Sequence, residues 1–543
     1  MTRFNIRKRD GLARTGIFET GSTSVKLPFA LAAETLFPSL ETLMGTNLPL
    51  CAPAALVNRF PPETGSQPVT IHPLRDNPAQ SGDCVMVANW HTALLNPRNY
   101  TDWLIGLKEK TPVDTAWYAP GTALPSNAHI LCYSGFDLFD FLAVDLKTAQ
   151  ALFCTPEGEF PAGLLGSGIC TCAGCQTKNL LQHNRQALLR EIALISRFIE
   201  ASQLRDLVES RCRMNAAHVA IMRHLDNQYP FTERHLPIAR SGVMRANSGE
   251  SLQRAEVRRF AERVINRYCP PKTDVAVLLP CSAKKPYSLS QSHKKFQRAI
   301  AGRAHELIVT SPLGLVPREL ECIYPAGHYD VPVTGYWDAE ECSVIARILA
   351  RYFKRHAYRR IIAHLEGGAL KVAQMAAGKC GITLEFTCKE RPTAESALNA
   401  LDAALAGERR MKDDRLHGMA SYQFSIDLET KGTTVRGHYP DLFYSKNNVQ
   451  IFSIDTGTGM LRPTFDGWHL IPEGYRVYID DFIPEGDVLV PGVVRADPGI
   501  RDGDEVLVVG PRALATGRAA LPTEDILRSR RGVAVRVRKI KRL

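Results

Sequence analysis

A thiol, two lysines and an imidazole occur together in the segment PCSAKKPYSLSQSH, residues 280–293. The segment directly follows the apolar run VAVLL, and residues at the carboxyl end of a parallel strand line the usual crevice of an α/β sheet. Cys281 has Lys284, Lys285 and His293 near it in sequence, and positive neighbours favour the nucleophilic thiolate. We therefore predict nucleophilic chemistry at Cys281. A buried thiol at a strand end, beside lysines that face solvent, is the alternative.

Three cysteines and one histidine lie within fourteen residues in the first third of the chain, at Cys170, Cys172, Cys175 and His183. Three soft sulfur atoms and an imidazole match the tetrahedral coordination of Zn²⁺. Gly174 would let the backbone bend between the thiolates, and Cys154 is an alternative to His183 as the fourth ligand. Because four protein ligands leave no open position, we expect a structural metal and not a catalytic one.

A sheet must hold the Cys281 segment in place, and the sequence predicts one. Apolar runs and helical patterns alternate after residue 274: VAVLLP, HELIVTS, a helix over residues 338–355, YRRIIAHLE, a helix through KVAQMAAG, and ITLEFT. Such alternation is typical of a parallel α/β sheet. Roughly the first 150 residues suit βα units, and helical periodicity follows over residues 180–226 and 250–268.

The C-terminal stretch, residues 475–543, has the pattern of a small barrel with a basic face. Its short strands are separated by Asp-Gly and Pro-Gly turns. The last sixteen residues, RSRRGVAVRVRKIKRL, contain eight Lys or Arg and no acid, and their alternation with valine indicates a strand with one apolar and one cationic face. We predict a nucleic-acid partner. The alternative is a generally basic, solvated surface.

The length and composition of the chain limit its domain number, its partners and its location. The chain has 543 residues, too many for one hydrophobic core, so we expect three or four domains. The formal charge of +11 suits a polyanionic partner, because each neutralised phosphate releases counterions. No apolar run is long enough to span a membrane, and the first residues lack the apolar segment of a secretory signal. With 14 cysteines and no export signal, we expect a reducing, cytoplasmic location.

The cysteine run and two other segments resemble the tRNA-guanine transglycosylases. The Cys-x-Cys-x-x-Cys spacing is similar to that family's zinc site, GLARTG at residues 11–16 resembles its opening strand, and GFDLFD at residues 135–140 resembles its nucleophile strand. The resemblance implies a TIM-barrel-like domain in which Asp140 occupies the position of the nucleophilic carboxylate. The continuation FDFLAVD departs from the family pattern, so we expect a degenerate barrel over residues 1–230.

A longer resemblance connects the chain with the archaeosine synthases. The residues that match that family's signature are Pro280, Cys281, Lys285, Pro286, Tyr287, Ser290 and His293. TSPLGLVPRELE, residues 310–321, and YPAGHYDVPVTGYW, residues 324–337, match as well. The resemblance implies action on the nitrile of 7-cyano-7-deazaguanine (preQ0) at position 15, in the D-loop of tRNA. It also implies lysine or glutamine/ammonia as the nitrogen donor and, for some members, a radical-SAM partner protein.

The resemblance also implies a role for each of several side chains. Cys281 is the nucleophile, His293 the acid and base, Lys285 activates the thiol or polarises the nitrile, and Asp330 or His328 deprotonates the incoming amine. The candidate catalytic residues are Cys281, Lys285, Ser290, His293 and Asp330. The candidate substrate-binding residues are Pro280, Pro286, Tyr287, Ser311, Arg318, Glu319, His328 and Asp140. Direct attack by the amine, with Cys281 only shaping the pocket, is the alternative to a covalent step.

The C-terminal barrel resembles a PUA domain, which implies binding of structured RNA. The candidate phosphate-binding residues are Arg518, Arg536, Arg538, Lys539 and Lys541. Such contacts position an RNA without reading its bases. The expected division is the degenerate barrel with its zinc site at residues 1–230, a central α/β parallel-sheet domain at 231–393, an α+β RNA-binding module at 394–474 and the PUA pseudo-barrel at 475–543. Within the module we expect strands in SYQFSIDL and NNVQIFSI.

Two other functions fit part of the sequence. One is a working transglycosylase that inserts preQ0 itself, although FDFLAVD argues against it. The other is a non-catalytic subunit that binds tRNA for a partner enzyme. It explains the zinc site and the basic tail, but not the thiol, imidazole and lysines after VAVLL. The sequence is compatible with a monomer or a homodimer.

Overall fold

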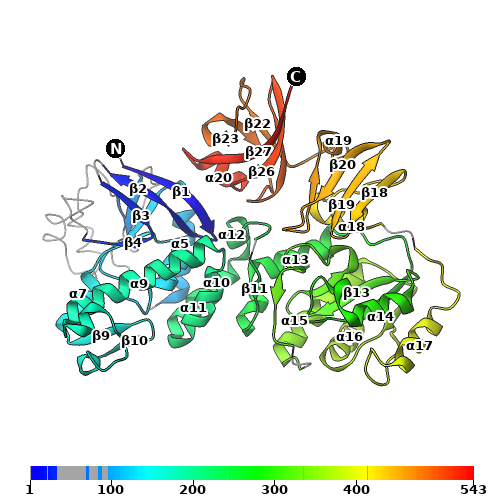
Figure 1. The fold of residues 1–543 in the computed structure, drawn as a ribbon, viewed down its shortest axis with the longest axis horizontal. Coiled ribbons are helices and arrows are strands. Elements are labelled where there is room, and N and C mark those ends of the chain that lie inside the picture. Colours follow the sequence, from blue (N-terminus) through cyan, green and yellow to red (C-terminus); the bar gives the residue numbers. More distant parts are fainter. Residues whose placement is uncertain are drawn as a thin grey trace.

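The computed structural model describes residues 2–20, 23–32, 69–71, 83–87, 96–240, 242–333, 336–411 and 414–543. Figure 1 shows an N-terminal group of elements in blue and cyan, a central group in green, and two C-terminal sheets in gold and red. The red sheet lies between the N-terminal group and the gold sheet in this view. Among the described helices, none combines the length and the apolar character needed to cross a membrane.

The N-terminal part contains an antiparallel and a parallel sheet. Strands β1 (Thr2–Asp10), β2 (Ala13–Thr20) and β3 (Thr23–Leu27) are antiparallel neighbours. The parallel strands have the order β4-β8-β7-β6-β5, with bounds Phe29–Ala30, Leu138–Phe139, Ala116–Ala119, Cys84–Val87 and Val69–Ile71. Helices α5 (Pro97–Lys108), α6 (Ala128–Tyr133) and α7 (Leu142–Ala149) alternate with these strands, as βα units do. The TIM-barrel-like closure stays a prediction, since residues 33–68 and 72–82 lie outside the described ranges.

Helices follow this sheet and include the metal-binding segment. A hairpin of β9 (Leu152–Thr155) and β10 (Gly158–Pro161) precedes the short helix α8 (Ala173–Gln176) and the long helix α9 (Leu180–Glu200). Leu188, Ile192, Ile195 and Ile199 of α9 are buried, as their helical spacing predicts. The remaining helices are α10 (Leu204–Arg211), α11 (Ala216–Asn227) and α12 (Tyr229–Arg234).

A mixed five-stranded sheet forms the central domain. Its order is β14-β13-β12-β16-β17, with bounds Gly314–Pro317, His305–Thr310, Val275–Pro280, Arg360–Ala363 and Glu385–Phe386. Four strands are parallel, as predicted, but β14 is antiparallel to β13. The cause is a tight turn in which Thr310 pairs with Gly314, whose φ of +82° suits glycine. Apolar runs alone do not distinguish such a hairpin from a βα unit.

Five helices pack around the central sheet. They are α13 (Ala255–Asn266), α14 (Gln291–Ile300), α15 (Ala339–Arg355), α16 (Gly367–Cys380) and α17 (Glu395–Ala404). Leu401 of α17 and the adjacent Leu405 share a buried cluster with Val275, Val277 and Phe296. Helix α17 therefore packs as part of the central domain, and we place the boundary with the next unit after it.

A four-stranded antiparallel sheet forms the module that follows. It is preceded by α18 (Arg415–Phe424) and contains β18 (Thr433–His438), β19 (Asp441–Lys446), β20 (Val449–Ile454) and β21 (Leu461–Pro463), with α19 (Phe465–Trp468) after it. The strand expected in NNVQIFSI is β20. The strand expected in SYQFSIDL is wrong, because SYQF forms the end of α18. Met419, Tyr422 and Phe424 pack into the central core from this helix, and packing overrides local β propensity.

Six strands form the C-terminal pseudo-barrel, in the order β23-β27-β26-β25-β22-β24. Their bounds are Val488–Leu489, Val533–Arg542, Ala513–Ala519, Glu505–Val509, Arg476–Ile479 and Val493–Ala496, and α20 spans Thr523–Arg528. Ala534 and Val535 of β27 are buried, whereas Arg536 and the last five residues of the strand are exposed. The predicted small barrel with a basic last strand is confirmed.

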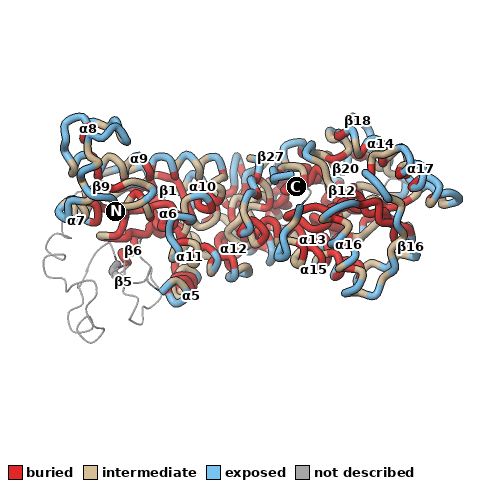
Figure 2. Tube along the Cα trace, turned by 90° about the horizontal axis from the view of Figure 1, so that it is seen from below, coloured by how far each residue is buried: buried red, intermediate tan, exposed pale blue. Residues whose placement is uncertain are grey.

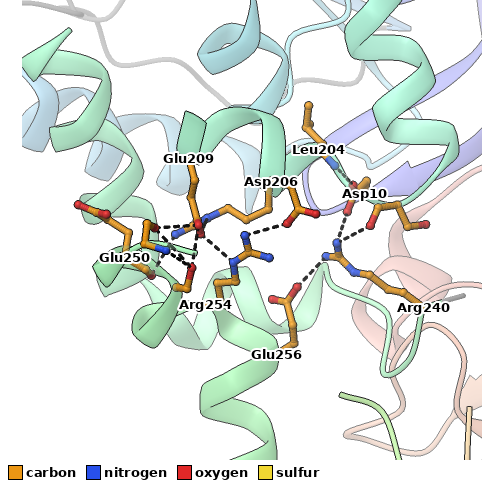
Figure 3. Close-up of polar contacts among 12 residues, drawn as sticks. Asp10, Leu204, Asp206, Glu209, Arg240, Glu250, Arg254 and Glu256 are labelled. Atoms are coloured by element: carbon orange, nitrogen blue, oxygen red, sulfur yellow. Dashed lines mark hydrogen bonds and ion pairs between the residues drawn. The ribbon is translucent and has the colours of Figure 1, made fainter. Parts of the chain in front are cut away.

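Buried ion pairs join the N-terminal part to the central domain (Figure 3). Arg254, at 2% exposure, donates to Glu209 at 2.7 Å and pairs with Asp206 of α10 at 2.8 Å. The neighbouring pairs join Arg240 to Asp10 at 3.0 Å and to Glu256 at 3.3 Å. Figure 2 shows buried residues continuing through the middle of the molecule, where these segments meet.

Candidate functional site

The thiol of Cys281 lies at the carboxyl end of β12, the middle strand of the central sheet. Parallel pairing of Pro280 with Val309 places Cys281 beside Thr310, at the end of β13. Burial raises the pKa of Cys281, while the Thr310 hydroxyl and the Lys285 ammonium partly offset that shift. The strand-end position is the predicted one. The direction of the pKa shift is opposite to that expected from the lysines, because lost hydration outweighs the cation.

Lys285 is the lysine that the structure brings to this thiol. Its Nζ lies 4.0 Å from the centre of the Tyr329 ring, a cation–π contact. Burial lowers the pKa of Lys285, and Cys281 and Asp330 act in the opposite direction. Asp330 is exposed at the end of β15 (Tyr329–Asp330), which pairs with β11 (Met244–Arg245). A thiol, an amine and a carboxylate thus meet at one edge of the sheet.

A chain of hydroxyl groups supports the thiol from the interior. The Tyr329 hydroxyl is 2.5 Å from Thr310 Oγ1 and 2.6 Å from the Tyr287 hydroxyl. Burial raises the pKa of both tyrosines, so their phenols stay neutral. Tyr287, expected to bind substrate, is fully buried and orients Tyr329 and Thr310, which in turn contacts Cys281.

Glu341 belongs to this site and was missed by the sequence analysis. Ser311, expected to bind substrate, donates its hydroxyl to the Glu341 carboxylate. That carboxylate also accepts from the Asp338 N–H at 3.3 Å, completing a capping box at the start of α15. Glu341 is close enough to Cys281 to raise the pKa of the thiol. The available signal was the spacing of Asp338 and Glu341, which marks a helix start but not the strand end that it faces.

Ser290 and His293 hold helix α14 and the loop before it. Ser290 is the N-cap of α14, and its Oγ accepts from the His293 N–H at 3.2 Å. The His293 ring is buried, and its Nδ1 accepts from Arg318 at 2.8 Å. Burial and the Arg318 cation lower the pKa of His293 to about 3, so the ring is neutral near neutral pH. This geometry favours a positioning role for both residues over the expected proton transfer.

Arg318 and Glu319 lie in the turn η5 (Arg318–Leu320) and are held by protein groups. Arg318 pairs with Glu306 at 2.6 Å, and Glu319 pairs with His305 at 3.3 Å. Because β14 is antiparallel, it returns the chain to the amino edge of the sheet, where β13 begins with His305. The structure therefore does not bring Glu319 to Cys281.

The remaining residues expected in the site occupy its borders. Pro280 ends β12 and Pro286 precedes the turn η4 (Tyr287–Leu289), so the two prolines bracket the Cys281 loop. Burial lowers the pKa of His328, and the Asp455 carboxylate of the module acts against that shift. His328 therefore lies toward the junction with the module.

The predicted metal ligands come together in the N-terminal part. The ligand atoms of Cys170, Cys172, Cys175 and His183 all lie within 4.8 Å of one another. His183 Nδ1 is 3.3 Å from Cys172 Sγ and 3.4 Å from Cys175 Sγ, separations that suit ligands of one ion. His183 Nε2 donates to the Cys154 carbonyl at 3.0 Å, which turns Nδ1 toward the sulfur atoms. Cys154, the alternative ligand, thus contributes its backbone carbonyl.

Asp140 is buried after β8 and surrounded by hydrogen-bond donors. Its carboxylate accepts from the Tyr118 hydroxyl at 2.7 Å, the Gly121 N–H at 2.9 Å and the Leu142 N–H at 3.0 Å. Burial raises the pKa of Asp140, and these bonds act against the shift. A carboxylate held by three donors fastens adjoining turns, so the geometry favours a structural role over a nucleophilic one.

A basic cavity of about 660 Å³ lies where β1, the module and the C-terminal barrel meet. Its cationic lining residues are Arg7, Lys8, Arg9, Arg240, Arg462, Arg518, Arg531 and Arg536. Arg518 and Arg536, both expected to bind phosphate, are among them. Arg518 also pairs with Glu505 at 2.9 Å and with Asp455, and Arg538 pairs with the same Glu505 carboxylate at 2.6 Å. Lys539 and Lys541 are exposed on β27.

Two family models match the central domain and the C-terminal barrel separately, and several relatives match most of the chain. Residues 257–405 match a family model described as "Domain of unknown function (DUF5591)", and residues 475–541 match the PUA domain. Archaeosine synthase subunit alpha of Methanosarcina acetivorans is 37% identical over 487 residues, 82% of this chain and 78% of that protein. Archaeosine synthase of Haloferax volcanii is 38% identical over 466 residues, 82% and 80% of the two chains. The tRNA-guanine(15) transglycosylase of Methanobrevibacter smithii is 26% identical over 440 residues, 75% and 63% of the two chains.

Proposed function

The chain belongs to the archaeosine synthase family and is an enzyme of tRNA archaeosine biosynthesis, and on that premise we propose the reaction it performs. It adds an amine to the nitrile of preQ0 at position 15 of tRNA, with lysine or glutamine/ammonia as the source of nitrogen. The main support for this chemistry is that Cys281, Lys285 and Asp330 lie near one another at the carboxyl edge of the central sheet. A radical-SAM partner and a cytoplasmic location belong to the same proposal.

The proposed reaction has two steps at one sulfur atom. The Cys281 thiolate adds to the nitrile carbon, a proton reaches the nitrile nitrogen, and a thioimidate forms. The amine nitrogen then adds to the same carbon and the carbon–sulfur bond breaks. The thiolate takes up the proton that the amine loses, and an amidine remains on the base. A covalent intermediate divides one difficult addition to a weak electrophile into two easier ones.

Lys285 and Asp330 supply the proton transfers in this scheme. Burial lowers the pKa of Lys285, so its neutral form is more accessible than that of a free lysine. Lys285 takes the proton of the Cys281 thiol and returns it to the nitrile nitrogen. Asp330, exposed beside Lys285, accepts a proton from the incoming ammonium group.

A mass analysis of nucleoside 15 tests the reaction. Wild-type protein is incubated with preQ0-containing tRNA and with lysine, glutamine or ammonium, and the mass gain identifies the donor. We expect Cys281→Ser to lose the conversion, and wild-type protein without an amine to retain a covalent RNA adduct at Cys281. Full conversion by Cys281→Ser, with no adduct on the wild type, would establish direct amine attack instead.

Zinc and RNA have separate places in this proposal. Cys170, Cys172, Cys175 and His183 would hold Zn²⁺ as a closed structural site, because the three thiols and the oriented imidazole fit that ion. The PUA domain and the basic cavity would hold the tRNA, with Arg518 and Arg536 as phosphate contacts inside the cavity and Lys539 and Lys541 outside it.

Two alternative functions predict different assay results. A working transglycosylase would exchange labelled preQ0 base into unmodified tRNA, but the three donors around Asp140 argue against a free nucleophile there. A non-catalytic tRNA-binding subunit would bind preQ0-tRNA and leave nucleoside 15 unchanged with every amine.

A further inference from the structure

Large apolar side chains are exposed in three of the loops around the Cys281 thiol. Leu289, in the loop after β12, is 40% exposed, and Phe386, at the end of β17, is 55% exposed. Tyr336, in the loop before α15, is 77% exposed. Its neighbour Trp337 packs on the start of α16, where a Cβ at Gly368 would lie 3.0 Å from the indole ring. Singly exposed apolar residues are ordinary, but several gathered at one edge mark a surface that meets a partner.

Strand pairing places these loops on one edge. Strands β12, β16 and β17 are parallel, with Leu278 opposite Ala363 and Ala363 opposite Phe386. With a spacing of about 4.8 Å between strands, Phe386 lies about 10 Å across the sheet from Leu278, which comes three residues before Cys281. Helix α16 begins directly after β16, so its contact with Trp337 brings Tyr336 to the same edge. The exposed residues therefore lie at or near the sheet edge that carries the thiol.

Lysines accompany these apolar side chains. Lys284 precedes Leu289 in the loop after β12, Lys389 follows Phe386, and Lys371 lies near the start of α16; all three lysines are exposed. Aromatic faces beside cations are the chemistry of surfaces that bind single-stranded nucleic acid, because bases stack on the rings and phosphates contact the ammonium groups. Lysine is depleted at protein–protein interfaces, so these lysines favour RNA over a protein partner.

We propose that Leu289, Tyr336 and Phe386, with Lys284, Lys371 and Lys389, form a stacking rim for unpaired RNA nucleotides that flank the target base. The inference rests on the proposed function for the position of that base, and it adds the form of RNA recognised. A base reaches Cys281 only after turning out of its own stack, and its neighbours then lie at the rim. Tyr336 and Phe386 replace the stacking that those neighbours lose.

Affinity for short RNAs tests the rim directly. The variants are Tyr336→Ala, Phe386→Ala and their double, with Phe160→Ala on β10 as a matched control, since Phe160 is an exposed aromatic of the N-terminal part. The probes are an eight-nucleotide single strand and the same sequence as a duplex. We expect each rim variant to raise the Kd for the single strand about tenfold and to leave the duplex Kd unchanged. Phe160→Ala should bind both probes as the wild type does.

Conservative variants and fluorescence separate stacking from folding. Tyr336→Phe and Phe386→Trp keep a ring and should restore the single-strand affinity. A 2-aminopurine placed beside the target nucleotide in tRNA should change its fluorescence on binding wild-type protein, and this change should disappear with the double variant. The dependence of Kd on salt should be the same in all these proteins, because no charge is altered.

The outcomes also separate the rim from the proposed function. If wild-type protein converts the nitrile and the double variant keeps the wild-type single-strand Kd and KM for tRNA, the rim is overturned and the surface is assigned to a protein partner. If the rim variants lose single-strand affinity while wild-type protein converts no nitrile, the rim stands and the proposed reaction falls. Equal losses on single strand and duplex also overturn the rim.

Discussion

Burial raises the pKa of Cys281, and the Thr310 hydroxyl and the Lys285 ammonium act against that shift. The variant Lys285→Met replaces the cation by a neutral side chain of similar length. The positive charge then no longer offsets the effect of burial on the pKa of Cys281. The thiolate should then form only at higher pH, and its reaction at pH 7.5 should slow about tenfold for each unit of pKa increase. The measurement is the rate of iodoacetamide alkylation as a function of pH, followed by mass spectrometry on the Cys281 peptide.

Lys285→Arg is the control for this prediction, because it keeps a positive charge near the thiol. Its alkylation midpoint should stay close to that of the wild type. The pH dependence of nitrile conversion should change in the same way. Only Lys285→Met should shift the ascending limb of the pH–rate profile to higher pH. An unchanged midpoint in Lys285→Met would show that Lys285 does not influence the thiol.

At the residue scale, the position of Cys281 was predictable from the sequence, whereas the contacts of its neighbours depend on distant residues. Cys281 was placed correctly because a short apolar strand and the motif after it are local features. Ser290 and His293 are three residues apart, a spacing that fits both a catalytic face and a helix cap. Burial and the cation of Arg318, which lies 25 residues away in sequence, together keep the His293 ring neutral, and neither is visible in the local sequence. Glu341 could not be assigned because its approach to Cys281 depends on the packing of α15.

At the scale of elements, helices α8 and α9 must pack closely for the metal ligands to converge. A Cβ added at Gly174 of α8 would lie 2.3 Å from the backbone nitrogen of His183, a distance that forces the two helices apart. Gly174→Ala should therefore lower both zinc content and the midpoint of thermal unfolding, although it changes no ligand. Atomic emission spectroscopy and circular dichroism on the same preparation measure the two quantities.

Gly163→Ala is a matched control in the same segment, because a Cβ there would meet no heavy atom within 4 Å. It should keep the wild-type zinc content and midpoint. Full metal loading of Gly174→Ala would mean that the cysteines and His183 converge without close packing of α8 on α9.

Elements with a periodicity of their own were predictable, and elements defined by distant contacts were not. Helix α9 buries the residues that its spacing selects. Strand β14 turns antiparallel because of Gly314, and the end of α18 is helical because Met419 and Tyr422 reach the central core. Neither cause is visible in the local pattern of apolar residues. That pattern suits a parallel strand at β14 and a strand at the end of α18.

For the whole molecule, the buried ion pairs of Arg254 hold the N-terminal part against the central domain (Figure 3). Arg254→Met would leave the buried carboxylates of Glu209 and Asp206 without this cation, a loss that typically costs about 3–5 kcal/mol. We expect a clearly lower urea midpoint. Arg359→Met, which breaks solvent-exposed pairs with Asp274 and Glu408, should leave the urea midpoint close to that of the wild type, because exposed ion pairs contribute little to stability.

The same network should make the junction sensitive to acid. Burial alone would raise the pKa of Glu209, but Arg254 and Arg205 outweigh it and lower the pKa to about 2. A carboxylate with a lowered folded-state pKa stabilises the fold fully above its ordinary pKa, and this contribution is lost as pH falls toward 2. The wild type should therefore lose stability between about pH 4.5 and 2 more steeply than Arg254→Met. Parallel losses in the two proteins would contradict the assignment.

The basic cavity joins β1, the module and the PUA domain, and its lining includes the carboxylate of Asp502. Burial raises the pKa of Asp502 to about 6, with Arg9 and Lys8 acting against the shift. At pH 7.5 the carboxylate is charged and opposes phosphate, and as pH falls through 6 it takes up a proton and the cavity becomes more positive. The wild type should bind tRNA about fivefold more tightly at pH 5.5 than at pH 7.5. Asp502→Asn should bind more tightly than the wild type at pH 7.5 and change less with pH. Filter binding at constant salt measures both proteins, and equal pH dependence in the two would place the tRNA outside this cavity.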